Sequence, residues 1–186
     1  MKSIEQELKM ALNEREYNIL LGVAKVTPQL QTNYYFRHRG MSADVMVRLR
    51  RKGDEYKLCY KRRLSDSSGV AVSDERECEI TASFANSMRH RGIKRSEMQQ
   101  LLGVEMPNNL TLVGCMDTYR AKFKIQQWTV ELDKSVYSGR VDYELECENL
   151  YVEQLEKLKN YLFYKYGIVF RQSKPKVQRF LEAYVK

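Results

Sequence analysis

The segment Glu5-Gln6-Glu7-Leu8-Lys9 places a charged residue at every second position. Successive side chains of a β-strand point to opposite faces, so Glu5, Glu7 and Lys9 would share one face. Near the other end of the chain, Asp142-Tyr143-Glu144-Leu145-Glu146 repeats this spacing with carboxylates only. Because several basic strands are predicted between these two acidic segments, we expect a charged cavity that binds a metal ion and an anion. This arrangement predicts an enzyme that acts on phosphates.

Several predicted strands carry charges of one sign on one face and apolar side chains on the other. The charged faces are formed by Arg48 and Arg50; Lys57 and Lys61; Glu75, Glu77 and Glu79; Arg120, Lys122 and Lys124; and Asp142, Glu144, Glu146 and Glu148. A half-exposed antiparallel sheet also turns a charged face to water, but such a face usually mixes signs. We therefore predict a closed sheet in which acidic and basic strands face one another across a lumen, with the apolar faces outside under helices.

The two kinds of charge need different ligands. Clustered carboxylates stay ionised only with a cation, and hard oxygen ligands suit Mg²⁺ or Mn²⁺ rather than zinc. Clustered Arg and Lys need an anion, and guanidinium groups match phosphate oxygens bidentately. A divalent metal that bridges carboxylates to a polyphosphate would satisfy both. The sequence has no G-x-x-x-x-G-K-[ST] loop, and its two histidines make a His-based zinc site or triad improbable.

Composition sets the remaining limits. The 186 residues, 43% of them hydrophobic, suit a single domain with a real core. The formal net charge of +8 indicates an anionic partner. We find no apolar leader region and no apolar run of membrane-spanning length, so no membrane partner is expected. We expect Cys59, Cys78, Cys115 and Cys147 to be free thiols of a cytoplasmic protein.

The pattern of elements predicts the α+β class, with about eight antiparallel strands and a few helices outside. The expected strands are 3–10, 31–37, 44–51, 55–63, 72–81, 110–125, 127–134 and 139–148. The expected helices are 12–25, 83–102 with a break near Gly92, 150–166, and one capped by Ser173 that runs to about Tyr184. Residues 64–70 are expected to form a flexible loop.

In this order and spacing, the charged strands resemble the CYTH domain, the triphosphate tunnel metalloenzyme superfamily, in its bacterial single-domain form. The resemblance covers the chain as one domain, residues 1–186. It rests on Glu5-x-Glu7-x-Lys9, Asn33-Tyr34-Tyr35-Phe36, Val47-Arg48-Leu49-Arg50, Leu58-Cys59-Tyr60-Lys61, Glu77-x-Glu79, the strand around Arg120, the segment 142–146 and Ser173-Lys174. The resemblance implies an eight-stranded antiparallel β-barrel, a tunnel with a charged interior that binds a triphosphate and one or two divalent metals.

The same resemblance implies roles for individual residues. The implied metal ligands are Glu5, Glu7, Glu144 and Glu146. The implied phosphate ligands are Lys9, Arg48, Arg50, Lys61, Arg120, Lys122 and, from the last helix, Lys174. Glu77 and Glu79 would be metal ligands or would orient basic residues, and Lys9 and Glu79 are the catalytic candidates. One departure stands out: Arg37-His38 replaces the Asp-Thr of many members, and an extra cation there could favour a longer phosphate chain.

The predicted function is a Mg²⁺- or Mn²⁺-dependent phosphohydrolase that cleaves inorganic tripolyphosphate or a nucleoside triphosphate. Within the family, the alternatives are a class IV-type adenylate cyclase and a thiamine triphosphatase. An alternative of another class is a non-catalytic module that binds polyphosphate or nucleic acid, which the net charge favours. Acidic strands argue against nucleic acid because bare carboxylates repel a phosphate backbone. The sequence leaves open whether the protein is a monomer or a homodimer.

Overall fold

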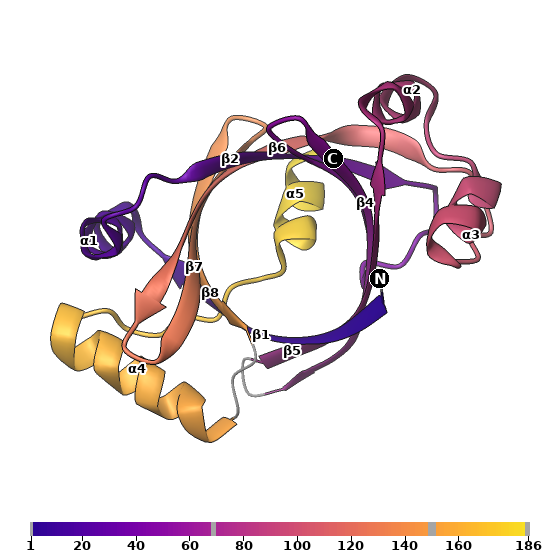
Figure 1. Ribbon diagram of the computed structural model, residues 1–186. Coiled ribbons are helices and arrows are strands. Elements are labelled where there is room, and N and C mark those ends of the chain that lie inside the picture. The colour runs from indigo at the N-terminus through magenta and orange to yellow at the C-terminus, as the bar shows by residue number, and fades with distance from the viewer. Residues whose placement is uncertain (1, 68–69, 149–151, 185–186) are drawn as a thin grey trace.

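Eight antiparallel strands close into a barrel with its axis along the view of Figure 1. The computed structural model describes the backbone of residues 2–67, 70–148 and 152–184, and the side chains of 8–65, 72–147 and 154–184. The strands are β1 (Lys2–Leu12), β2 (Gln29–Arg37), β3 (Val45–Lys52), β4 (Glu55–Ser67), β5 (Val70–Ile80), β6 (Thr111–Ile125), β7 (Trp128–Tyr137) and β8 (Arg140–Glu148). Their order around the barrel is β1-β5-β4-β3-β2-β6-β7-β8. Closure comes from β1, which pairs with β5 on one side and β8 on the other, and the predicted eight-stranded α+β barrel is confirmed.

Five helices accompany these strands within the described part of the chain. They are α1 (Glu14–Ala24), α2 (Ala82–Arg91), α3 (Arg95–Leu102), α4 (Val152–Tyr166) and α5 (Lys176–Tyr184). The predicted break at Gly92 separates α2 from α3. Gly92 has φ +83°, and a Cβ there would lie 2.3 Å from the carbonyl oxygen of Leu110, so a side chain does not fit. No described helix is long and apolar enough to cross a membrane.

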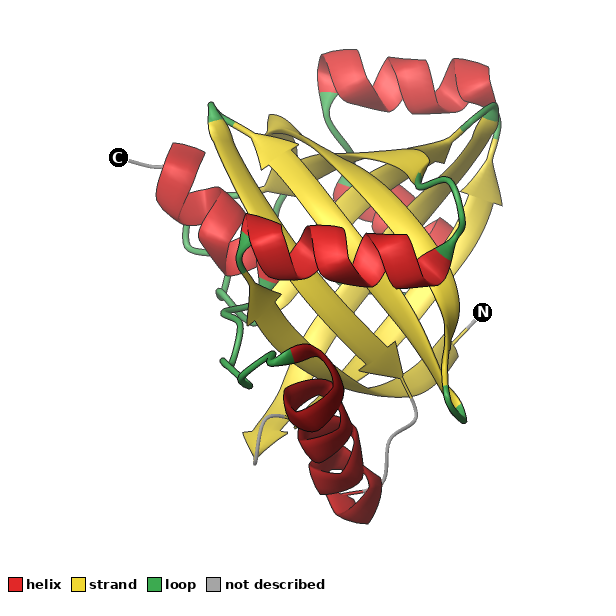
Figure 2. Cartoon of the chain, turned by 90° about the vertical axis from the view of Figure 1, so that its left-hand side faces the viewer, coloured by secondary structure: helices red, strands yellow, loops and turns green. Residues whose placement is uncertain are grey.

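The apolar strand faces point outward and are covered by helices, as the alternation predicts. Figure 2 shows helices lying across the outside of the strands. One outer core joins the faces of β1, β7 and β8 to α1 and α4, and includes Leu8, Leu132, Leu145 and Leu158. A second core joins β3 and β4 to α2 and α3. Because the helices bury the outer face, the inner face is left for the charged residues.

Helix α5 is different, because it packs at one end of the barrel interior (Figure 1). Its Phe180 is fully buried among Tyr35, Met46, Met116 and Tyr137, which extend from β2, β3, β6 and β7. The ring centroids of Phe180 and Tyr35 lie 4.4 Å apart. This end of the lumen is therefore apolar and filled, and the charged part of the lumen begins beyond it.

Two local expectations were wrong. Residues 64–67 continue β4, and Ser65, Asp66 and Ser67 pair with β5 after an irregularity between Arg63 and Ser65. Pairing with a long neighbouring strand outweighs the turn preference of these polar residues. Residues 68–69, which belong to the same expected loop, lie outside the described part of the chain. The last helix begins at Lys176, because Pro175 disfavours helical geometry at the residue before it, and the Ser173 hydroxyl donates to the carbonyl of Lys174 instead of capping. All four cysteines are free thiols.

Candidate active site in the barrel lumen

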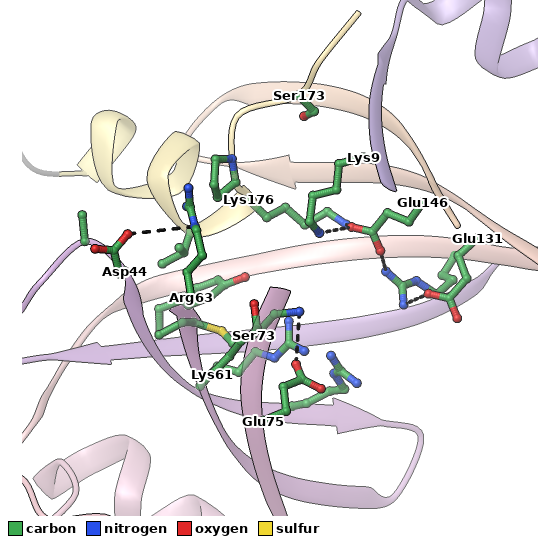
Figure 3. A pocket seen from close by; sticks show the side chains of 18 of the residues that line it. Lys9, Asp44, Lys61, Arg63, Ser73, Glu75, Glu131, Glu146, Ser173 and Lys176 are labelled. Carbon is green, nitrogen blue, oxygen red and sulfur yellow. Dashed lines mark hydrogen bonds and ion pairs between the residues drawn. The ribbon is translucent and has the colours of Figure 1, made fainter. Parts of the chain in front are cut away.

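A cavity of about 240 Å³ lies inside the barrel, next to α5 (Figure 3). Its charged lining comes from seven strands and one helix: Lys9, Arg48, Arg50, Lys61, Arg63, Glu75, Arg120, Glu131, Glu146 and Lys176, with Asp44 from the β2–β3 loop. A second cavity of about 600 Å³ lies toward the opposite mouth, where Lys52, Lys57 and Lys122 line it. Arg50, Arg120 and Glu131 line both cavities, so the two are neighbouring parts of one lumen.

One side of this lumen is basic. We call Arg48, Arg50, Lys61 and Arg63, on β3 and β4, the basic wall. Arg48 and Arg50 form no ion pair with any described carboxylate, and the buried Nε of Arg48 has no hydrogen-bond partner. Arg50 Nε donates to Asn33 Oδ1 over 3.4 Å. Lys61 lies 3.4 Å from Glu75. Guanidinium groups remain charged at all ordinary pH values, so two arginines without a carboxylate partner among the described residues are suited to bind an anion.

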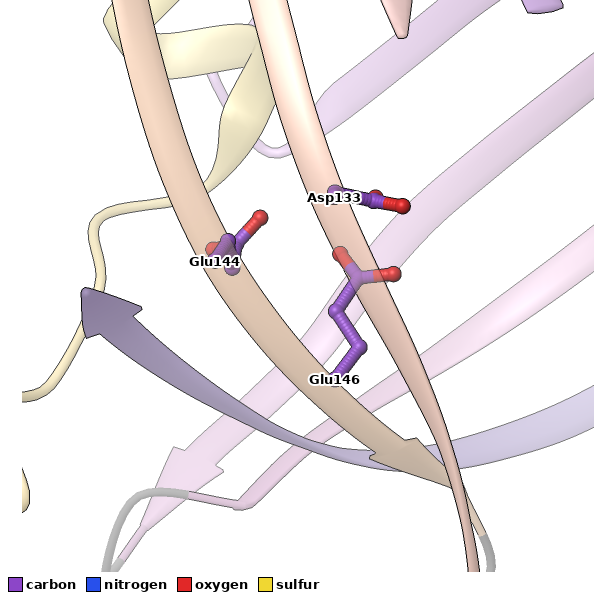
Figure 4. A group of neighbouring side chains, drawn as sticks. All are labelled: Asp133, Glu144 and Glu146. Atoms are coloured by element: carbon purple, nitrogen blue, oxygen red, sulfur yellow. The ribbon is translucent and has the colours of Figure 1, made fainter. Parts of the chain in front are cut away.

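The opposite side is acidic. Asp133 on β7 and Glu144 and Glu146 on β8 form a group that we call the acidic cluster (Figure 4). One carboxylate oxygen from each lies within 4.8 Å of the others, and all three residues are buried. The strand register explains the grouping, because Asp133 is opposite Glu144 and Glu146 follows two positions later on the same face.

Four cations contact this cluster: Lys9, Arg120, Lys176 and, at Glu144, Arg179. Lys9 Nζ lies 2.8 Å from Glu146, and Arg120 makes two hydrogen bonds to Asp133, of 2.8 and 2.6 Å, and one of 2.6 Å to Glu146. Lys176 Nζ contacts all three carboxylates. Burial raises the pKa of Glu146, but Lys176, Lys9 and Arg120 lower it more and hold it well below its usual value. The pKa of Asp133 is lowered for the same reason, chiefly by Lys176 and Arg120.

Glu144 shows that the cluster fits a metal ion. Both of its carboxylate oxygens are buried and accept no hydrogen bond, although Lys176 Nζ and Arg179 Nη2 lie 3.1 and 3.0 Å from one of them. A buried carboxylate without hydrogen bonds is costly, and native proteins rarely leave one so. Three convergent carboxylates are the hard oxygen donors that Mg²⁺ or Mn²⁺ requires.

The structure brings most of the predicted site residues together: Glu144 lies in the acidic cluster with Glu146, and the cavity is lined by Glu146, Lys9, Arg48, Arg50, Lys61 and Arg120. Lys122 lines the second cavity, 2.9 Å from Glu131. Glu5, Glu7 and Lys9 occupy alternate positions of β1 and therefore share one face of the strand, and Glu7 is opposite Glu148. Their side chains lie outside the described part, so their metal-binding role stays a prediction.

Three predicted features lie elsewhere. Glu79 is exposed on β5, opposite Lys57, and is not among the described residues that line the two cavities. Lys174 is 62% exposed and pairs with Glu182 at 3.0 Å. Arg37 donates to the backbone carbonyls of Met41, Ser42 and Val45, so its charge holds the β2–β3 loop and does not reach the cavity lining.

Sequence reasoning missed Glu131, Asp133, Lys176 and Arg179. The first two had a signal, because Glu131 and Asp133 alternate with Val130 and Leu132 in the same way as the acidic residues of β8. No sequence signal points to Lys176. Its position depends on the start of α5 after Pro175 and on the packing of α5 in the barrel end.

Comparison with known proteins agrees with this geometry. The family model of the CYTH domain matches residues 3–181. The chain is 24% identical, over 97% of its length and 96% of the relative's, to YjbK of Bacillus subtilis (strain 168), a protein named as a candidate triphosphatase. Two solved structures have the same fold. HpAC1 from Hippeastrum, described as having a dominant triphosphatase activity, gives a TM-score of 0.79 at 21% identity, covering 98% of this chain and 97% of that one. A candidate adenylate cyclase from Bacillus halodurans gives 0.78 at 22%, covering 96% and 98%.

Proposed function

Because the chain belongs to the CYTH domain family, we propose that it is a divalent-metal-dependent phosphohydrolase that cleaves a phosphoanhydride bond of a triphosphate. The observation that carries this proposal is that Arg48 and Arg50, which pair with no carboxylate in the described part of the chain, share one lumen with the acidic cluster. A triphosphate with its metal ion is the small-molecule ligand that satisfies both sides at once.

Phosphate binding falls to the basic wall. Arg48 and Arg50 sit two residues apart on β3 and can each offer a planar pair of N–H donors to phosphate oxygens. Lys61 adds a point charge from the neighbouring strand, and Lys9 and Arg120 approach from the acidic side. These five cations would hold a chain of phosphates along the lumen and exclude bulk water from it.

Metal binding falls to the acidic cluster. Asp133, Glu144 and Glu146 would hold the ion, with Glu5 and Glu7 as further predicted ligands from β1. The ion would supply Lewis-acid stabilisation of charge that develops on phosphate oxygens. The protein's part is to fix the three carboxylates rigidly, since each lies on a central region of a paired strand.

The attacking water needs a proton acceptor. Glu79, the sequence-based candidate, is exposed away from the cavity lining, whereas Glu75 and Glu131 line the cavity. Among the described residues, Glu75 pairs with Lys61 at 3.4 Å, while Glu131 is engaged by both Arg120 and Lys122. Glu75 is therefore the better placed carboxylate to accept the proton, and Glu75→Gln compared with Glu79→Gln tests this choice.

The function is tested by phosphate release from tripolyphosphate, ATP and thiamine triphosphate with Mg²⁺ and Mn²⁺ in turn. Release of orthophosphate from at least one of them is expected. A cyclase would instead yield cyclic nucleotide and pyrophosphate from ATP, so product analysis separates the two activities. The only aromatic ring in the described lining of the two cavities belongs to Tyr35, which gives little surface for a base. Absence of any metal-dependent turnover, together with tight salt-sensitive binding of polyphosphate, would replace the hydrolase with a binding module.

A further inference from the structure

Lys176 occupies the centre of the acidic cluster. Its Nζ lies 2.9 Å from Glu146 and 3.1 Å from Glu144, and it also contacts Asp133. No other described cation reaches all three carboxylates. Of the three, Lys9 contacts Glu146, Arg120 contacts Asp133 and Glu146, and Arg179 contacts Glu144. The side chain is 12% exposed, so this ammonium group is a nearly buried counter-ion of the cluster.

An ammonium group and a divalent ion cannot both sit there. The three carboxylates converge within 4.8 Å, and a magnesium-sized ion needs oxygen ligands at about 2.0–2.1 Å. An ion bound by all three would take the space of the Lys176 nitrogen, and two positive groups so close in a buried site repel strongly. Binding of the ion therefore requires Lys176 to leave the cluster.

The chain allows this exchange without loss of the helix. Lys176 is the first residue of α5, whereas the helix is anchored further along by Phe180 in the barrel end. Tyr184 adds a second anchor, because its ring packs against Gly114 and its hydroxyl donates to the carbonyl of Cys115 over 3.1 Å. Lys176 also lines the cavity that faces Arg48 and Arg50, so the displaced amine can turn toward a bound anion.

We propose that Lys176 is a resident counter-ion that competes with the divalent metal for the acidic cluster and moves to the phosphates when metal and substrate are both bound. This inference rests on the proposed function, since it takes the acidic cluster as the metal site. It makes Lys176 a positioning residue that couples the two ligands. Metal alone leaves the amine without a partner, whereas a triphosphate supplies one, so each ligand strengthens binding of the other.

The test measures Mn²⁺ affinity of the full chain without substrate, for the wild type, Lys176→Met and the control Lys165→Met. Lys165 is exposed on α4, so its replacement removes the same charge far from the cluster. We expect Lys176→Met to bind Mn²⁺ about tenfold more tightly or better, which corresponds to about 1.4 kcal/mol, and the control to match the wild type. We also expect tripolyphosphate to strengthen Mn²⁺ binding less in Lys176→Met than in the wild type.

A merely structural role predicts the opposite, namely equal or weaker Mn²⁺ binding by Lys176→Met, and that result would overturn the inference. If that variant does not fold, the wild type decides through amine acylation read by mass spectrometry. Saturating Mn²⁺ should raise the labelling of Lys176 and leave exposed Lys165 unchanged; constant labelling of Lys176 refutes the exchange. If the wild type shows metal-dependent hydrolysis but Lys176→Met binds Mn²⁺ no more tightly, or the labelling of Lys176 stays constant, the exchange is refuted and the proposed function stands. Absence of both hydrolysis and Mn²⁺ binding removes the two together.

Discussion

Lys9 on β1 lies directly opposite Glu146 on β8, and its Nζ donates to Glu146 Oε1 over 2.8 Å. This contact joins strands from the two ends of the chain at the seam where the barrel closes. The pairing continues across the next two strands: Glu146 on β8 is opposite Glu131 on β7, and Glu131 is opposite Lys122 on β6. The neighbouring carboxylates of Glu131 and Glu146 are thus flanked by Lys122 on one side and Lys9 on the other, which explains how acidic residues on adjacent strands are tolerated inside a closed sheet.

Glu144→Gln should remove activity and leave the barrel intact. The substitution keeps the volume of the side chain but removes the charge of a proposed metal ligand, whose oxygens accept no hydrogen bond from the described residues. Replacement of groups that only orient metal ligands typically costs 10- to 100-fold, so loss of a ligand should lower kcat by about a hundredfold or more. Phosphate release and Mn²⁺ affinity should fall together, while circular dichroism stays unchanged. Glu105→Gln, on an exposed loop, is the control. An active Glu144→Gln enzyme would exclude Glu144 as a ligand.

Arg48→Lys should weaken substrate binding more than its charge change suggests. Lysine keeps the charge but loses the planar pair of donors, and a hydrogen bond to a charged group contributes about 1.5–3 kcal/mol, or about ten- to a hundredfold in KM for tripolyphosphate. Arg51 follows on the same strand and is exposed, so Arg51→Lys is a matched control. Equal KM values for the two variants would show that Arg48 does not bind the substrate.

The barrel and most of its lining could be predicted because both depend on a period of two. Residues such as Arg48 and Glu144 alternate with Leu49 and Leu145, and only one face of each strand can be buried under helices. The register between distant strands could not be read in the same way. Nothing in the sequence near Asp133 states that it will lie opposite Glu144 or receive Arg120 from the other side.

Features at strand and helix ends were the least predictable. Lys174 and Lys176 both follow the last strand-like segment, and a helix capped by Ser173 favours the first of them. The observed start of α5 at Lys176 turns the second into the cavity and leaves Lys174 with Glu182. From the sequence, Arg37 is likewise expected to add a cation to the site, but its guanidinium donates to three backbone carbonyls of the β2–β3 loop. Contacts made by loops decide both outcomes, and loop contacts leave no periodic pattern in the sequence from which they could be predicted.

Glu97→Gln should cost stability at neutral pH and not in acid. Glu97 caps α3 through the backbone N–H of Lys94 at 2.8 Å and pairs with Arg91. Burial raises the pKa of Glu97, but Arg91 and Lys94 lower it below its usual value. A lowered folded-state pKa gives stability that is present above the unfolded pKa of about 4.3 and disappears as pH falls through the folded value.

The expected loss for Glu97→Gln is about 1 kcal/mol at pH 7 by urea unfolding. The difference from the wild type should shrink steadily below about pH 4, where the wild-type carboxylate takes up its proton. A constant difference between pH 7 and pH 3 would mean that the charge of Glu97 contributes nothing and that only its shape matters.

Gly114→Ala should loosen α5. A Cβ on Gly114 would lie 2.5 Å from the ring of Tyr184, closer than any tolerated contact, so the ring or the helix must shift. Overpacking of this kind costs about 1–3 kcal/mol. Tyr184→Ala removes the ring, and Gly114→Ala in that background should then cost little. A double-mutant cycle by urea unfolding should give a coupling of about 1–2 kcal/mol, and hydrogen exchange of α5 should rise in Gly114→Ala alone. If the two substitutions add without coupling, Tyr184 does not hold the helix in the barrel end.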